Sequence, residues 1–116
     1  MEQYKVKISK TALHDIIEIR DYIAITLDSP MSSEKLISLI FEEIRKLSYL
    51  ASSFSLIKSE PFKSIGIRRS NLKNYYFYYR IIEEKKQVDV ITVIYYRRQQ
   101  LKVLKEKMGK YNDENR

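Results

Sequence analysis

The sequence predicts an α+β fold: an antiparallel sheet with a helical hairpin packed on one face, in the order β-α-α-β-β-β, followed by a last helix. Two amphipathic stretches separated by a Ser-Pro break fill residues 10–50. Residues 65–96 are rich in β-branched and aromatic residues and contain short polar turns, which is typical of a strand meander. A chain of 116 residues has room for one domain, expected to span residues 1–116.

The N-terminal half is predicted to form one strand and two helices. Apolar residues alternate with Lys over residues 4–8, which predicts a short strand. Ser9 is placed to cap a helix over about 10–26, where apolar residues recur every three or four positions. Pro30 suits the start of a second helix, expected at about 31–50, because proline lacks an N–H that would be unsatisfied there. The short link between them predicts an antiparallel hairpin.

The C-terminal half is predicted to supply the rest of the sheet. Residues 51–64 are expected to form a loop against the body, since Pro61 disfavours a regular element. Alternation predicts a strand near residues 65–68. Nearly continuous aromatic and β-branched residues predict a central strand over 75–82 and a further strand over 88–96.

The last segment is expected to be a short helix with a frayed tail. Apolar spacing predicts the helix over about 98–108, with Gly109 as its stop and residues 110–116 frayed. The domain core is expected within about residues 4–100. The sheet face opposite the hairpin should then stay partly open and carry alternate Tyr and Arg side chains of the last three strands.

Composition excludes several classes of function. The chain has no cysteine, which excludes disulfides, thiol nucleophiles and Cys-ligated zinc. His14 is the sole histidine and is expected on a helix surface, so a catalytic triad or a histidine metal site is disfavoured and no cofactor or metal is expected. No apolar run approaches the ~20 residues of a membrane span, and no signal-peptide pattern is visible. The expected location is cytoplasmic.

Positive charge is concentrated in the second half of the chain. Residues 1–57 hold 7 Lys/Arg against 8 Asp/Glu, whereas residues 58–116 hold 15 against 7. Such asymmetry favours an anionic partner, although charge of this size also serves solubility alone.

Tyrosine and arginine gather in the same half of the chain. Guanidinium groups bind phosphates or carboxylates in a fork geometry, and phenol rings stack on bases or fill interface pockets. About half of the tyrosines are expected to be core. The candidate catalytic or target-binding residues are Arg68, Arg69, Tyr76, Tyr78, Arg80, Tyr95, Tyr96, Arg97 and Arg98.

Three stretches resemble the RelE/ParE superfamily of bacterial toxins from type II toxin–antitoxin modules. They are YKVKISKTALHDIIEIRDYI, SEKLISLIFEEIRKLSYL and IRRSNLKNYYFYYRIIEEKKQVDVITVIYYRRQ. The first is similar to the family's opening strand and helix, the second to its second helix, and the third to its Tyr/Arg strand, charged hairpin and basic final strand. The resemblance covers about residues 4–100 and implies the order of elements predicted above.

The resemblance implies a growth-inhibiting toxin neutralised by a cognate antitoxin, with two possible targets. RelE-like members cut mRNA on the ribosome without a metal, whereas ParE-like members act on DNA gyrase. Tyr76 stands where RelE-like nucleases usually carry Arg, and Tyr95 where the ParE-like ending usually has His. The Arg97-Arg98 ending and the long helical hairpin favour the ParE-like target.

Other functions stay open at this point. The chain could be a metal-independent mRNA interferase in which cations activate Tyr95 or Tyr96, or a non-toxic remnant that only binds its antitoxin. In each case the expected partner is an acidic, amphipathic antitoxin segment in a hetero-oligomer, lying against the sheet edge or the hairpin. Gyrase or the ribosome with its mRNA is the expected target, and no membrane partner is expected.

Overall fold

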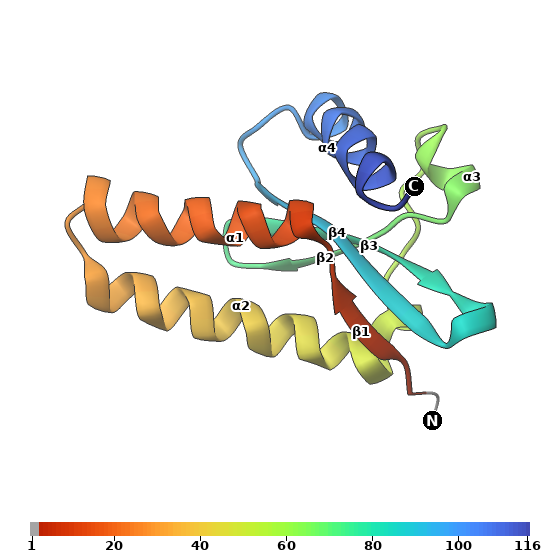
Figure 1. Ribbon diagram of the computed structural model, residues 1–116, viewed down its shortest axis with the longest axis horizontal. Helices are drawn as coiled ribbons and strands as arrows, with labels where there is room; N and C mark the ends of the chain where they lie inside the picture. Colours follow the sequence, from red (N-terminus) through yellow and green to blue (C-terminus); the bar gives the residue numbers. More distant parts are fainter. Residues whose placement is uncertain (1–2) are drawn as a thin grey trace.

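The computed structural model describes residues 3–116 as a four-stranded sheet with helices on both faces (Figure 1). The predicted α+β class and order of elements are confirmed. In chain order the elements are β1 (Lys5–Ile8), α1 (Lys10–Asp21), a π-helical turn η1 (Tyr22–Thr26), α2 (Pro30–Leu50), η2 (Ala51–Ser53), α3 (Phe62–Ile65), β2 (Arg68–Leu72), β3 (Tyr75–Ile82), η3 (Glu83–Lys85), β4 (Gln87–Tyr95) and α4 (Gln100–Glu114).

The sheet has the strand order β1-β4-β3-β2. β2, β3 and β4 form the predicted antiparallel meander, with Tyr75 opposite Tyr95 in the β3–β4 register. β1 pairs with β4 in parallel, Val6 opposite Val88, which makes β1 an edge strand. This parallel pair follows from the hairpin, because two helices intervene before the chain returns to the sheet.

The helical hairpin begins and turns as expected, with one irregularity. Ser9 caps α1: its hydroxyl accepts a hydrogen bond from the Ala12 amide at 2.9 Å and donates one to the Ile91 carbonyl at 2.8 Å. The first helix continues to residue 26, but its last five residues form η1 rather than α-helix. Pro30 occupies the first position of α2, as predicted.

The segment expected to be a loop contains a single helical turn, α3, directly after Pro61. The Glu60 carboxylate accepts hydrogen bonds of 2.8 Å from both the amide and the hydroxyl of Ser64, which stabilises this turn. Gly66, at φ 88°, ends α3, so β2 starts at Arg68, later than the predicted strand.

One hydrophobic core lies between the hairpin and the sheet. Apolar stripes of both helices pack on the β-strand residues that point to this face, as in a two-layer domain. Its buried residues are Tyr4, Ala12, Ile16, Ile40, Ile44, Leu47, Ala51, Phe77, Tyr79, Val88, Val90 and Val93.

A second core lies on the opposite face, so the expectation of an open sheet face is wrong. α4 lies across the side of the sheet that the hairpin leaves uncovered (Figure 1). Its apolar side chains, with those of α3 and the strands, are shielded from water. The buried residues of this core are Phe62, Ile67, Tyr78, Ile91, Ile94, Val103, Leu104, Met108 and Tyr111.

The predicted end of the last helix is also wrong. α4 runs through Gly109 to Glu114, and Tyr111, from the tail expected to fray, is 1% exposed. A glycine within a helix costs only about 1 kcal/mol, which burial of the Tyr111 ring readily offsets. The domain core therefore extends beyond residue 100.

Polar contacts fix α4 to the first helix. Lys107 forms a 2.7 Å ion pair with Asp15, whose carboxylate also accepts hydrogen bonds from the Thr92 hydroxyl and the Val93 amide. At its other end, Glu114 accepts hydrogen bonds from the Lys10 and Thr11 amides. A carboxylate from the last helix thus satisfies amides at the start of the first.

We expect Glu114→Gln to lower the free energy of unfolding by about 1 kcal/mol at pH 7, the usual contribution of a helix-capping side chain. Burial alone would raise the pKa of Glu114, but hydrogen bonds from Thr11 and Lys10 lower it below the model-compound value of 4.5. A lowered pKa stabilises the fold above the unfolded-state value, and this contribution is lost as pH falls through the folded value.

Urea unfolding at pH 7 and pH 3 checks this. The difference in the free energy of unfolding between wild type and Glu114→Gln should be smaller at pH 3 than at pH 7. Glu106→Gln, at an exposed position of α4, serves as the control. An equal effect of both substitutions at pH 7 would mean that Glu114 caps nothing.

Candidate functional site

Four of the exposed candidate residues gather at the end of β4, beside the start of β3. Tyr95 and Tyr96 are 39% and 37% exposed, and Arg97 and Arg98 follow in the exposed loop before α4. Tyr75 lies opposite Tyr95 in the neighbouring strand. We refer to these five residues, Tyr75, Tyr95, Tyr96, Arg97 and Arg98, as the tyrosine–arginine end.

The rings of the tyrosine–arginine end form a contiguous surface. Tyr75 and Tyr95 make an edge-to-face contact with centroids 5.7 Å apart, and Tyr95 makes another with Tyr96 at 5.2 Å. Arg97 donates a 2.8 Å hydrogen bond to the Tyr96 hydroxyl. Among residues 3–116, no carboxylate pairs with Arg97 or Arg98. Two unpaired guanidinium groups beside three phenols suit an anionic or carboxylate-bearing partner.

Gln100, the first residue of α4, holds this loop in place. Its side-chain amide donates hydrogen bonds to the Tyr95 carbonyl at 2.8 Å and to the Arg98 carbonyl at 3.0 Å. Its side-chain carbonyl accepts a 2.7 Å hydrogen bond from the Tyr78 hydroxyl. Tyr78 is 1% exposed, so it supports the loop from the second core.

We expect Gln100→Ala to increase amide hydrogen exchange of the loop, measured at Arg98, by about 30-fold, because losing two hydrogen bonds of about 1 kcal/mol each eases local opening. Gln99→Ala is the matched control, since the exposed Gln99 side chain makes no capping hydrogen bond. Equal exchange in the two variants would contradict the role given to Gln100.

The remaining candidates lie apart from the tyrosine–arginine end or are already engaged. Arg68 donates to the Phe54 carbonyl. Arg69 lies over the Tyr76 ring, 4.1 Å from its centroid, and is exposed. Arg80 donates a 3.2 Å hydrogen bond to the hydroxyl of Tyr111, a residue outside the predicted candidates.

Burial makes several tyrosines weaker acids than usual. It raises the pKa of Tyr78, an effect that Arg69 partly opposes. Burial also raises the pKa of Tyr75, with a further increase from Tyr95. Burial and the hydrogen bond to Asp89 raise the pKa of Tyr111 to about 12. A general base at neutral pH needs a lowered pKa, so these three phenols are unsuited to that role.

His14 lies exposed on α1. Within residues 3–116, no cluster of three His, Cys, Asp or Glu side chains is arranged to hold a metal ion. No helix within these residues is both long enough and apolar enough to cross a membrane.

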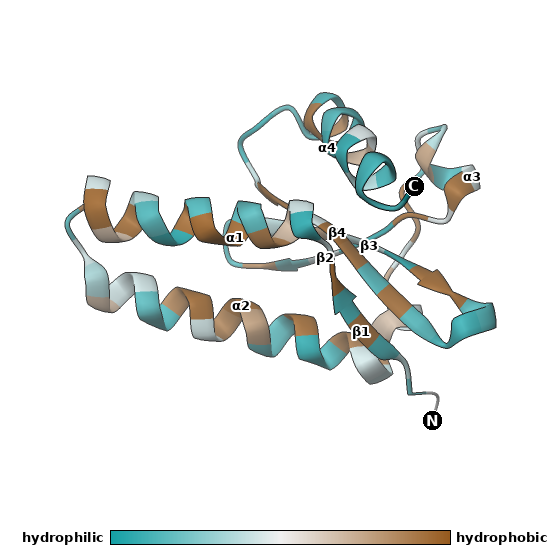
Figure 2. Ribbon diagram, in the orientation of Figure 1, coloured by the Kyte–Doolittle hydropathy of each residue, from teal (hydrophilic) through white to brown (hydrophobic). Residues whose placement is uncertain are grey.

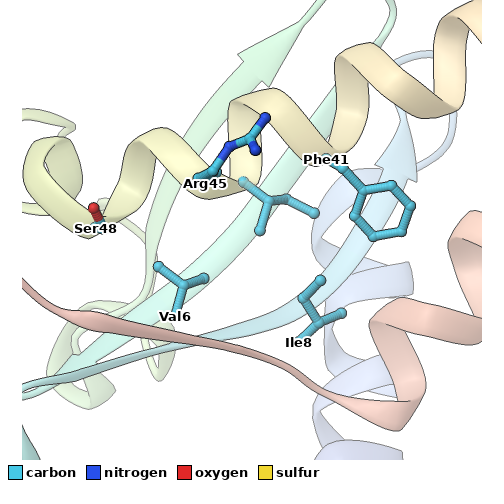
Figure 3. A pocket seen from close by; sticks show the side chains of 6 residues that line it. Val6, Ile8, Phe41, Arg45 and Ser48 are labelled. Carbon is cyan, nitrogen blue, oxygen red and sulfur yellow. The ribbon is translucent and has the colours of Figure 1, made fainter.

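Two grooves flank the first core. The smaller, of about 360 Å³, lies between β1 and α2; Val6 and Ile8 point from β1 toward α2, Ile8 beside Phe41 and Val6 on the side of Arg45 and Ser48 (Figure 3). The larger, of about 660 Å³, lies between the end of the hairpin and the tyrosine–arginine end. We call them the β1 groove and the hairpin groove. The hairpin groove is lined by Asp15, Glu18, Ile19, Tyr22, Ile23, Leu27, Asn74, Tyr75, Val93, Tyr95 and Arg98.

Sequence comparison decides the family. Residues 6–101 match the family described as the ParE toxin of the type II toxin–antitoxin system parDE. The chain belongs to the ParE toxin family. This ParE-family protein is therefore a type II toxin of the RelE/ParE superfamily, as the resemblance implied. No curated protein sequence matches it.

Solved structures share the fold of this ParE-family toxin. The chromosomal ParDE system of P. aeruginosa aligns with a TM-score of 0.66 and 21% identity, over 80% of this chain and 96% of that one. The Mycobacterium tuberculosis RelBE2 complex aligns with a TM-score of 0.61 and 20% identity, over 82% of this chain and 93% of that one. A mutant of free E. coli RelE in which two arginines are replaced aligns with a TM-score of 0.56 and 14% identity, over 97% of both chains. Identities this low establish the common fold alone.

Sequence reasoning missed two parts of this ParE-family toxin. Gln100 carries no periodic or motif signal, because its role depends on the carbonyls that the β4 end brings near it. The exposed end of the hairpin was not identified, and Leu27 there is 54% exposed. The sequence does contain a signal for this exposed apolar end, because Asp28 is the only charged residue between Tyr22 and Met31.

Proposed function

We propose that this ParE-family toxin inhibits DNA gyrase by binding it through the tyrosine–arginine end, and that a cognate antitoxin neutralises it. The family match supports the ParE-like target. The observation that carries the proposal is the exposure of two unpaired arginines beside three contiguous tyrosines, on a sheet whose other face is covered by α4.

This arrangement suits binding better than acid–base chemistry. Tyrosine and arginine are the residue types that most often dominate protein–protein interfaces. Metal-free RNA cleavage needs a base, an acid and a cation around one phosphate. The sole histidine lies on α1, and the buried phenols have raised pKa values.

One contact favours the second candidate, a ribosome-dependent mRNA endonuclease. Arg97 donates directly to the Tyr96 hydroxyl, so a guanidinium and a phenol oxygen meet on the exposed surface. In that function Tyr96 would be the general base and Arg98 would stabilise the phosphate. Both functions use the same surface, so only the target separates them.

The antitoxin is expected to present an acidic, amphipathic segment. The toxin has a net charge of +7, and the excess lies in residues 58–116, which include the tyrosine–arginine end. A segment that folds on binding loses conformational freedom, so its apolar side chains must be buried to provide net affinity.

Induced expression with two separate readouts tests the target. We expect plasmid supercoiling to fall and gyrase cleavage complexes to accumulate while the rate of protein synthesis is initially unchanged. Truncated mRNA with normal supercoiling would instead identify the endonuclease. Growth unaffected at high expression would identify a protein that has kept only antitoxin binding.

A further inference from the structure

The turn between the two long helices carries the most exposed large apolar side chains of residues 3–116. Four of them, at 54% to 77% exposure, lie within ten residues of one another, whereas every other large apolar side chain in that range is less than half exposed. The four are Tyr22, Ile25, Leu27 and Met31, which we call the hairpin tip. Figure 1 shows that this end projects beyond the sheet, and Figure 2 shows apolar residues reaching it. Exposed apolar surface gathered in this way marks an interaction site.

The hairpin tip lies at the same end of the molecule as the tyrosine–arginine end. Tyr22 and Leu27 line the hairpin groove on the helical side, and Tyr95 and Arg98 line it on the side of the sheet. Ile25 and Met31, the two most exposed side chains of the tip, lie outside the groove. A large partner that covers the tyrosine–arginine end and extends past the groove therefore meets the hairpin tip next.

The tyrosine–arginine end is too small to bind a protein target alone. A specific protein–protein interface takes about 800 Å² and about 20–30 residues from each partner. Five residues, of which Tyr95 and Tyr96 are less than half exposed, supply only a part of that area. The remaining contacts must come from surface that adjoins them. The hairpin tip is such a surface, and it offers the apolar side chains that the centre of an interface needs.

Charge narrows what the hairpin tip can bind. Residues 21–34 contain Asp21, Asp28 and Glu34 but no Lys or Arg. Nucleic acid and anionic membranes are bound through Lys and Arg, so both are disfavoured as occupants. A second copy of the chain would bring another net charge of +7, which opposes self-association. The tip fits an apolar protein surface that is neutral or basic around its rim.

We propose that the hairpin tip is the second half of the gyrase-binding surface. An apolar patch of gyrase packs on Ile25 and Met31, while an acidic patch meets Arg97 and Arg98. The proposal rests on the target given under the proposed function and goes beyond it by naming a second contact surface of opposite chemistry. Loss of apolar contacts acts mainly on the dissociation rate, whereas loss of charged contacts acts on the association rate and its salt dependence.

Binding kinetics of the purified toxin on immobilised gyrase, measured together with supercoiling, test the proposal. We expect Ile25→Ser with Met31→Ser to weaken gyrase binding by about 100-fold, the factor for removing two apolar side chains from a buried contact. The loss should come from faster dissociation, with the salt dependence of association unchanged. Leu56→Ser with Ile65→Ser is the matched control, because these two apolar side chains are 39% and 42% exposed before and within α3.

The outcomes separate this inference from the target. Unchanged gyrase affinity of the tip variant, or an equal loss in the control variant, would overturn the inference and leave the target in place. A wild-type toxin that does not bind gyrase would overturn both. Sedimentation that shows a wild-type dimer and a monomeric tip variant would assign the tip to self-association and so contradict the proposal. Circular dichroism checks folding, which should be retained because Ile25 and Met31 are 76% and 77% exposed.

Discussion

Leu104→Ala is expected to lower the free energy of unfolding by about 2–5 kcal/mol, the range for removing a fully buried leucine. Leu104 is 0% exposed and lies in the second core with Ile91, Ile94 and Tyr78. Most of a small domain's net stability can be lost in this way. The measurement is urea denaturation followed by circular dichroism, with the denaturation slope checked for two-state behaviour.

Leu101→Ala is the control for this substitution. Leu101 is on the same helix but 47% exposed, so its removal should change stability by no more than about 0.5 kcal/mol. If both substitutions had the same small effect, α4 would not be docked on the sheet. The face opposite the hairpin would then be free to contact a target.

Reversing both charges, Arg97→Glu with Arg98→Glu, is expected to weaken gyrase binding by about 100-fold or more. Arginines at an interface are frequent hot spots, and reversal adds repulsion to the loss of hydrogen bonds. Stability should change by less than about 0.5 kcal/mol, because both side chains are exposed and neither forms an ion pair within residues 3–116. The measurements are growth inhibition by the variant in cells without the antitoxin, and the affinity of the purified variant for gyrase.

A double reversal elsewhere controls for total charge. Lys102→Glu with Lys105→Glu makes the same change in net charge on exposed positions of α4. We expect this variant to remain toxic. Equal loss of toxicity in both double variants would mean that general positive charge, rather than the tyrosine–arginine end, attracts the target.

Local patterns predicted the elements well because each signal depends on neighbouring residues. Ser9 and Pro30 marked helix starts through their own backbone chemistry. The run from Tyr75 to Ile82 predicted a central strand, and it pairs on both sides. The family resemblance, based on the same stretches, is confirmed.

The position of α4 could not be predicted from such local signals. The pattern identified the helix, yet Gly109 suggested an early end because the burial of Tyr111 depends on Asp89 and Arg80 in distant strands. The open face was expected because the hairpin covers only one side of the sheet, and no local signal placed α4 on the other side. Lys107 likewise had no visible partner in the sequence, since Asp15 is 92 residues away.

The candidate site was predicted in part. The exposed arginines and tyrosines after β4 were identified by residue type, and their side chains do lie together. Arg68, Tyr78 and Arg80 came from the same pattern but are engaged within the fold. Strand alternation alone cannot separate them, because both faces of this sheet are covered.

Supercoiling by purified gyrase, titrated with the toxin and with the two double variants, is the most direct test of a gyrase-binding tyrosine–arginine end. We expect the wild type and the Lys102/Lys105 variant to stop supercoiling at similar concentrations, and the Arg97/Arg98 variant to fail even in large excess. Undiminished supercoiling at saturating wild-type toxin would contradict that assignment.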